Sequence, residues 1–484
     1  MRVAALLLLG ACSDGHPDGA DSPSPNDGST VDALGSSCAR EVDCPDGLAC
    51  RVERVDDGDG IPEQVLTRCL PENDVAGATG DACASDGDCR TGLCHLGLCT
   101  EVCTADSCPA GFACNDVSAL PGGLLGPGPE CPAAVFSAAR FSACLPESAV
   151  IDLALGEAPS GEWTVLDVPS QAVSFTVISE TETPDAYVGV WWLLGRDGEE
   201  LYLLPDTQAE LLAQPIRYFP GDRISAMLVP NTPDVAFLRG TYCFRIGSDA
   251  GGTVASRARV KMAPGGTAGG GTLALDVHVL NLAGMGCGVD GLYAASAATH
   301  PLWQDTLGEM GEIFAQASIT LGPVAMHDIV GHPELDVIDY FDGPDDDGVY
   351  EELNALFSTG TGAAPDSVDV FLVRHLEGDN GPKNGVSGAI PGPPGVHGLP
   401  HAGVAINMEV PCMPSPSLSR VIAHEIGHQL GLFHNIQTET DGSRTHDPIE
   451  DTSDGADNLM FGTSDGIDLT PGQVFVLRTS PLVQ

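Results

Sequence analysis

Cysteines are concentrated in one short stretch of this chain, and that concentration limits the folds open to it. Thirteen of the 17 cysteines lie between residues 37 and 148, where little apolar surface is available to form a core. Small units of this kind are held together by disulfides, which form in oxidising, extracytoplasmic compartments. Spacings of five or six residues recur, and Cys-Leu-Pro-Glu occurs at both Cys69 and Cys144. We therefore predict repeated disulfide-rich modules over residues 37–148.

Two alternatives remain open for these cysteines. A zinc finger is the weaker one, because the stretch has no Cys-x2-Cys pair and His95 is its only histidine. Thirteen is also an odd number, so one cysteine either pairs with Cys243, Cys287 or Cys412 or stays free. Within the C-terminal region, we predict a disulfide between Cys287 and Cys412.

The first 36 residues have the composition of a leader and a tether. Arg2 precedes a short apolar run at residues 3–9, and the run ends in Leu-Gly-Ala-Cys12. This ending resembles the lipobox of bacterial lipoproteins, which implies a lipidated Cys12 and a membrane anchor in the bacterial cell envelope, at the outer membrane or cell surface. The alternative is an ordinary signal peptide with an incidental cysteine. Residues 13–36 hold little besides Asp, Ser, Pro and Gly, and we predict a disordered tether.

Acidic residues dominate the charge of the chain. There are 68 acidic against 20 basic residues, for a net charge of −48. Such a surface repels nucleic acid and anionic lipid, so neither is an expected partner. The acidic clusters at residues 56–62 and 342–348 are candidate calcium sites, although neither has a full twelve-residue calcium loop, and exposed turns are the alternative.

The remaining sequence predicts two larger domains. Residues 149–263 contain short alternating apolar runs separated by Asp, Gly, Pro and Asn, a pattern typical of a β-sandwich. Residues 264–272 form a predicted Gly-rich linker. Residues 273–484 mix strand-like and helix-like periodicity, so the chain is predicted to be multidomain, with an α/β (α+β) domain built on a mixed sheet at its C-terminal end. Eleven of the 13 histidines lie from His278 onward.

One segment of that last domain has the spacing of a metal site. His424 and His428 are four residues apart on a predicted helix, so both imidazoles lie on one face and can reach one zinc ion. Glu425 lies beside them, where its carboxylate can take a proton from a zinc-activated water. Gly431 can end the helix sharply at positive φ, and the returning chain then brings His434 to the metal as a third ligand.

The pattern His-Glu-x-x-His-x-x-Gly-x-x-His over residues 424–434 resembles the signature of the metzincin zinc metalloproteases. The segments 446–452 and 469–473 resemble the pappalysin branch of that family. Thr470 is also a candidate N-cap, with Gln473 completing a capping box, so a helix is predicted to start there. The resemblance implies a zinc cofactor bound by the three histidines, with Glu425 as the general base and Met460 in a methionine turn beneath the metal. One departure is Phe461, which stands where some metzincins place a tyrosine that assists the transition state.

The resemblance also implies a substrate strand. Residues 402–408 would form the exposed edge of the sheet and pair with an extended peptide through Gly403, Val404, Ala405 and Ile406. An exposed edge suits that role because it offers unpaired backbone groups.

The expected function is zinc-dependent hydrolysis of peptide bonds in protein or peptide substrates. Two rivals remain. In the first, the chain is a non-catalytic surface lipoprotein with a structural zinc domain. In the second, it is a latent zymogen in which a free upstream cysteine occupies the open position of the zinc ion.

Overall fold

The computed structural model describes most of the chain from residue 34 onward, so the predicted leader, the lipobox at Cys12 and most of the tether lie outside the described residues. It describes residues 34–484 apart from 57, 59–60, 74–76, 106, 121–122, 127–129, 185, 206–209, 211–213, 215, 219, 340–350, 361–363, 379–380, 439–443 and 464–465. The acidic cluster at residues 342–348 therefore lies entirely outside this part, as do residues 57, 59 and 60 of the cluster at 56–62. In the described part, no helix is long and apolar enough to cross a membrane.

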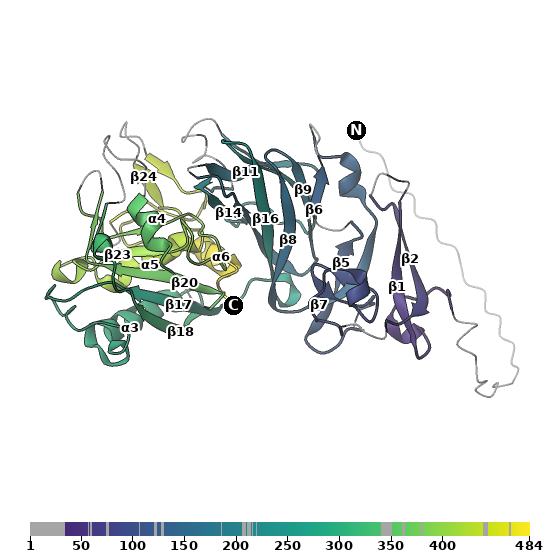
Figure 1. Cartoon of the computed structure of the whole chain (residues 1–484), viewed down its shortest axis with the longest axis horizontal. Helices are drawn as coiled ribbons and strands as arrows, with labels where there is room; N and C mark the ends of the chain where they lie inside the picture. Colours follow the sequence, from purple (N-terminus) through teal and green to yellow (C-terminus); the bar gives the residue numbers. More distant parts are fainter. Residues whose placement is uncertain are drawn as a thin grey trace, which may run out of the picture.

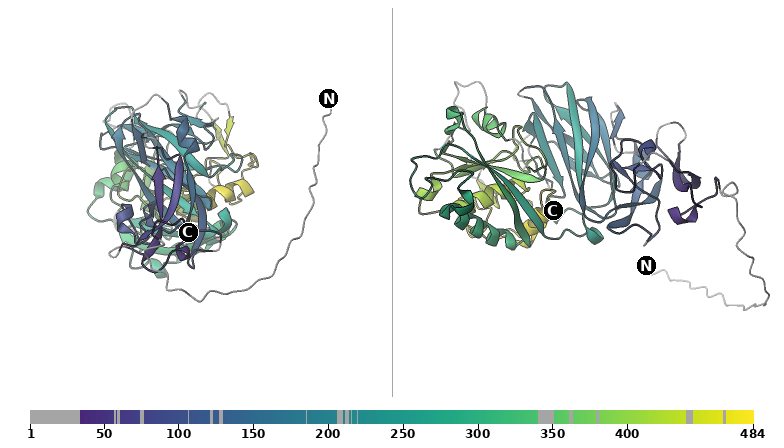
Figure 2. Two further views of the ribbon diagram at one scale, coloured as in Figure 1. Left: turned by 90° about the vertical axis from the view of Figure 1, so that its right-hand side faces the viewer. Right: turned by 60° about the horizontal axis from the view of Figure 1, so that its bottom comes forward.

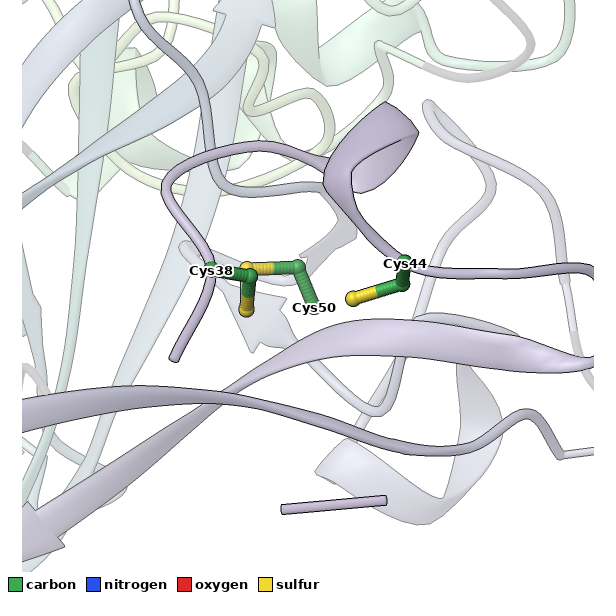
Figure 3. Close-up of side chains that lie close together, drawn as sticks. All are labelled: Cys38, Cys44 and Cys50. Carbon is green, nitrogen blue, oxygen red and sulfur yellow. A yellow bond between two sulfur atoms is a disulfide. The ribbon is translucent and has the colours of Figure 1, made fainter. Parts of the chain in front are cut away.

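The disulfide-rich stretch consists of three small units with one repeated pairing. In each unit the first cysteine pairs with the third and the second pairs with the fourth, as in Cys38–Cys50 and Cys44–Cys69. The other two units pair Cys83–Cys94 with Cys89–Cys99, and Cys103–Cys114 with Cys108–Cys144. Figure 3 shows how closely Cys38, Cys44 and Cys50 lie in the first unit. Each unit contributes one antiparallel hairpin: β1 (Leu48–Val55) with β2 (Gln64–Pro71), β3 (Cys94–His95) with β4 (Leu98–Cys99), and β5 (Phe112–Ser118) with β7 (Arg140–Pro146).

The one cysteine of this stretch that lies outside these six pairs is also bonded. Cys131 is bonded to Cys243, which links the disulfide-rich units to the next domain, and Cys287 is bonded to Cys412 as predicted. All sixteen cysteines of the described residues are therefore in disulfides, which is typical of an extracytoplasmic protein. The latent form that depends on a free cysteine finds no thiol among residues 38–484.

Two antiparallel sheets pack face to face in the middle of the molecule (Figure 1). Their inner faces share one core that contains Phe175, Val260, Val190 and Phe244. One sheet has the order β14-β10-β16-β8 and the other β12-β11-β15-β9-β6, with β13 beside β11. The strands are β6 (Gly123–Gly126), β8 (Ala149–Pro159), β9 (Trp163–Val168), β10 (Ala172–Glu180), β11 (Tyr187–Leu194), β12 (Glu200–Leu203), β13 (Gly221–Asp222), β14 (Ile224–Val229), β15 (Gly240–Ser248) and β16 (Thr253–Met262).

The C-terminal part is a five-stranded mixed sheet with the order β18-β17-β20-β23-β22. Four strands are parallel, and β22 runs antiparallel to β23. The strands are β17 (Gly271–Val279), β18 (Ile319–Asp328), β20 (Ser367–Val373), β22 (Gly385–Ser387) and β23 (Val404–Asn407). Strand β17 begins at Gly271, so the last two residues of the predicted linker over 264–272 lie in this strand.

Helices cover one face of this sheet. Leu275, Val277 and Val370 point from the strands into a core that they share with α3 (Pro301–Ala315), α5 (Leu418–Gln429) and α6 (Pro471–Thr479). The opposite face packs against the short α4 (Glu351–Phe357) through Phe357 and Phe371. The smaller pieces are β19 (Val337–Asp339) with β21 (His375–Glu377), β24 (Ile436–Thr438) with β25 (Arg444–His446), and the 3-10 turns Glu41–Asp43, Asp86–Asp88, Ala133–Ser137, Pro264–Gly266, Ala297–Thr299, Pro333–Leu335 and Val410–Cys412.

The three parts follow one another along the long axis, with the disulfide-rich units at one end and the mixed sheet at the other (Figures 1 and 2). The sandwich and the C-terminal part are joined by polar contacts as well as by the chain. The Lys261 ammonium on β16 donates to the carbonyl oxygens of Arg478 in the last turn of α6 and of Ser480 and Val483 just beyond it. Leu228 on β14 belongs to the same core as α5 and α6.

Replacing Lys261 by Met tests this connection. The change leaves three carbonyl groups without their donor, and we expect the free energy of unfolding to fall by about 2–4 kcal/mol. Urea denaturation followed by tryptophan fluorescence measures it. Arg257→Met on the same strand is the matched control and should change the free energy by less than about 0.5 kcal/mol. Equal effects of the two substitutions would show that Lys261 does not stabilise the interface.

Candidate metal centre and active site

Helix α5 positions the first half of the predicted site. It begins after Ser417, whose hydroxyl does not cap the helix and instead bonds the carboxylate of Glu309 on α3 at 3.1 Å. Arg420 forms an ion pair with the same carboxylate at 3.2 Å. Ile422 and Ile426 anchor the opposite side of the helix in the core. The position of His424 and His428 is thus fixed from both sides of α5.

The end of α5 brings in the third histidine. Gly431 has a φ of 111°, and the amides of Gly431 and Leu432 bond the carbonyls of His428 and Gly427, both at 2.9 Å. These two bonds are a Schellman motif, which stops the helix and reverses the chain. A side chain at Gly431 would also lie 3.1 Å from Leu228 of the sandwich. The predicted role of Gly431 therefore agrees with the local geometry.

The three imidazoles converge after this reversal. Their ring centroids lie 4.8 to 5.2 Å apart, and the Nε2 atoms of His424 and His434 are 3.2 Å apart. Each Nδ1 faces an oxygen acceptor: the Leu459 carbonyl for His424 and the Leu432 carbonyl for His428, both at 2.7 Å, and the Gln437 side chain for His434 at 3.1 Å. Because a carbonyl oxygen only accepts, Nδ1 carries the proton and every Nε2 lone pair is left for a metal.

Burial keeps these ligands neutral. Burial and the neighbouring His434 together lower the pKa of His424 to about 3, and burial with the two neighbouring histidines lowers the pKa of His428 well below its usual value. Neutral imidazole is the form that binds zinc, so the site does not have to release protons from its ligands near neutral pH. The three residues therefore fit a zinc ion with three protein ligands and an open position.

Glu425 is buried beside the histidines, at the cleft. Burial raises the pKa of its carboxyl to about 8, and a hydrogen bond from the Ser387 backbone opposes this rise. A bound dication would lower that pKa and favour the carboxylate, the form that accepts a proton.

Met460 lies against helix α5. It is fully buried, and a side chain at Gly427 would lie 2.7 Å from its sulfur, so the thioether packs directly against α5. The turn that carries it is held by Asn458, whose side-chain amide exchanges hydrogen bonds of 2.8 and 3.0 Å with Gln473 of α6. Gln473 also completes the predicted capping box with Thr470.

The predicted substrate edge is wrong. Gly403 precedes β23, and Val404, Ala405 and Ile406 lie within it, buried between β20 and β22. The edge on this side of the sheet is β22, a half-buried three-residue strand whose pattern is too short to recognise in the sequence. A Cβ on Gly385 of this strand would lie 2.7 Å from the Glu425 side chain.

Strand β22 and the histidines line one cleft of about 750 Å³. Ser415, Pro416, Gln437 and Thr463 are also at its wall. The residues that sequence analysis missed act through their backbone or as partners of the ligands: the Leu459 carbonyl, Gln437, Asn458 and Gly385. Only a three-dimensional arrangement reveals such roles, although the capping box at Gln473 marked part of the scaffold.

Comparison with known proteins adds little. No protein-family model matches the sequence, and no curated protein matches it. One similar solved structure is metalloproteinase-II from Bacteroides fragilis, with 11% identity, coverage of 70% of this chain and 88% of that chain, and a TM-score of 0.25. Another is a family two carbohydrate esterase from Cellvibrio japonicus, with 12% identity, coverage of 49% and 79%, and a TM-score of 0.12. At these TM-scores neither likeness carries an argument, so the interpretation of the site rests on its own geometry.

Gly431→Ala tests the reversal after α5. A side chain at φ 111° that also meets Leu228 should strain the turn by about 1–3 kcal/mol and displace His434. We expect zinc affinity to fall by roughly tenfold or more, measured by competition with a coloured chelator. Gly308→Ala on α3 is the control, because a side chain there meets open space. Unchanged zinc affinity in Gly431→Ala would show that this glycine is not needed to position His434.

Proposed function

We propose that this chain is a zinc-dependent endopeptidase with Glu425 as the general base. The observation that carries the proposal is the convergence of three imidazole Nε2 atoms, each oriented by a carbonyl at Nδ1, beside a buried carboxylate in a cleft. When bound, zinc supplies Lewis acidity that polarises a carbonyl and lowers the pKa of a water molecule.

The protein supplies the remaining parts of the chemistry. The Glu425 carboxylate accepts the proton of the attacking water and can return it to the leaving amine. The Ser387 backbone amide bonds this carboxylate and holds it beside the histidines. His424, His428 and His434 act as neutral ligands whose orientation is fixed from behind by Leu459, Leu432 and Gln437.

The free edge of β22 supports a peptide as the substrate. Backbone hydrogen bonds join Asn384 to Asn407 and Gly388 to Gly403, each at 2.9 Å. Because hydrogen bonding alternates along an antiparallel pair, the backbone groups of Gly385 and Ser387 then point away from β23. The Ser387 amide already bonds Glu425, so an extended peptide can pair with the backbone groups of Gly385 and with the Ser387 carbonyl as an additional strand, which places its backbone next to Glu425.

The proposal also covers the lipid anchor at Cys12 and the roles of the two other parts of the chain. A lipidated Cys12 would hold the enzyme at a bacterial envelope membrane, with the disulfide-rich units and the sandwich as spacers or binding modules. Protein segments outside the cytoplasm would then be its substrates.

Glu425→Gln tests the catalytic assignment. The amide keeps the shape of the side chain but cannot accept the proton, so we expect cleavage of an unfolded protein substrate to fall by roughly 10²–10⁴-fold. Zinc content should remain unchanged, and a zinc chelator should abolish cleavage by the unsubstituted protein. Glu312→Gln, at an exposed position on α3, is the control. Cleavage that survives in Glu425→Gln would refute its role, and no cleavage by the unsubstituted protein with zinc bound would favour the non-catalytic binding protein.

Peptide backbone methylation tests pairing with β22. Once a cleaved peptide is known, its amides on one side of the scissile bond can be N-methylated one at a time. We expect kcat/KM to fall at alternate positions and to change little at those between, because only every second residue of a strand faces its partner. A uniform response along the peptide would argue against strand pairing.

A further inference from the structure

A second group of histidine and aspartate side chains lies on the sheet face opposite α5. Asp276 and His278 are two residues apart on β17, so they share one face, and Asp369 on β20 is the partner of Asp276 in the parallel register. One ligand atom from each of these three residues lies within 4.8 Å of the other two. His327 on β18 is the partner of His278 and stacks on its ring, with centroids 5.3 Å apart.

Three of these four side chains are sealed from solvent, whereas His327 is 39% exposed. The side chains of Asp276, His278 and Asp369 are 0%, 2% and 1% exposed. Leu275 and Val277, which alternate with them along β17, point into the helix-covered core on the other face. The two carboxylates thus lie in a low-dielectric environment, where unpaired negative charge is costly.

The Asp276 carboxylate is the unusual member. It contacts Nε2 of His327, yet neither of its oxygens has a hydrogen bond of normal geometry among the described residues. Asp369 is different, because His278 Nε2 lies 3.0 Å from one of its oxygens and His397 Nδ1 lies 2.7 Å from the other. A fully buried carboxylate without a directed donor requires another source of positive charge.

The spacing matches that of ligands around a metal. His278 Nε2 and Asp369 Oδ1 are 3.0 Å apart, close to the 3.2 Å between His424 Nε2 and His434 Nε2 in the first site. Atoms bound to one ion at roughly 2.0–2.2 Å lie at about this separation. Two carboxylates and neutral imidazoles would also balance the charge of a dication.

We propose that Asp276, His278 and Asp369 bind a second divalent transition metal ion of the zinc class, and that His327 contacts the Asp276 carboxylate from the more exposed side. Mixed imidazole and carboxylate ligands suit zinc, iron or manganese better than calcium. His397 acts as a partner behind the ligands, because its Nδ1–H donates to Asp369 and orients that carboxylate.

The site has a structural consequence for the cleft. His397 lies on the segment between β22 and β23, and this segment also carries His401, whose Nε2 accepts the backbone amide of Asp222 in the sandwich at 3.1 Å. An ion at Asp369 would therefore hold the segment that leads from the free edge of the sheet back to β23. The ion serves structure, since α5 and its histidines lie on the other face.

Counting metal ions in the full chain tests the proposal independently of peptidase activity. After dialysis against zinc and gel filtration, elemental analysis should find two zinc ions per chain. The double variant His424→Ala/His428→Ala should keep one ion, and adding Asp276→Asn and Asp369→Asn to it should leave none. In the His424→Ala/His428→Ala variant, added zinc should raise the melting temperature and cobalt should give a visible absorption band.

Milder substitutions guard against misfolding of the aspartate variants. In the His424→Ala/His428→Ala background, His397→Leu should weaken binding of the remaining ion by roughly 10–100-fold in chelator competition. His375→Gln is the matched control, because His375 pairs with Glu377 and Glu409 outside the cluster. One zinc ion in the unsubstituted chain and none in His424→Ala/His428→Ala would overturn the proposal and leave an ion-paired His–Asp network. Zinc affinity that is unchanged in His397→Leu would overturn the assignment of residues to this site.

Discussion

The reversal of the chain at Gly431 is the constraint on which the functional architecture depends. A straight continuation of α5 would carry His434 away from His424 and His428, whereas the Schellman turn returns it to within 3.2 Å of His424. The same turn has no room for a side chain, because Leu228 of the sandwich and Val476 of α6 pack against it. One glycine thus joins helix termination, the metal centre and the contact between two domains.

The domains are coupled around this turn by buried polar groups. Lys261 of the sandwich donates to carbonyls at the C-terminal end of α6, and Arg217 donates to the carbonyl of His446, beyond the third histidine. Thr232 reaches the Pro448 carbonyl at 3.3 Å in the same segment. The sandwich therefore supports the segment between the third histidine and the methionine turn. Changes in the sandwich are expected to affect the proposed active site through this support, without any contact with substrate.

The two faces of the mixed sheet divide the chemistry of the C-terminal part. One face carries α5 with its neutral, buried histidines and the Glu425 carboxyl, whose pKa burial raises to about 8. The other face carries Asp276, His278 and Asp369, so two carboxylates and an imidazole are buried together there. Strand alternation makes this separation possible, since neighbouring residues of β17 point to opposite faces. The proposed second ion would stabilise the sheet that presents the first site.

Local patterns in the sequence were sufficient for the elements that depend on near neighbours. The His-Glu-x-x-His spacing defined α5 and its metal-facing side, Gly431 predicted the turn, and Thr470 with Gln473 predicted the start of α6, because helix faces and caps involve residues only a few positions apart. The spacing of the cysteines predicted disulfides but left their pairing open, and Cys131–Cys243 spans 112 residues. The edge of the sheet was assigned wrongly to residues 403–406, because β22 is only three residues long and its place depends on pairing with β23. The meeting of Asp276 with Asp369 likewise depends on strand order, and pairings between distant segments are decided by the tertiary packing of the whole sheet.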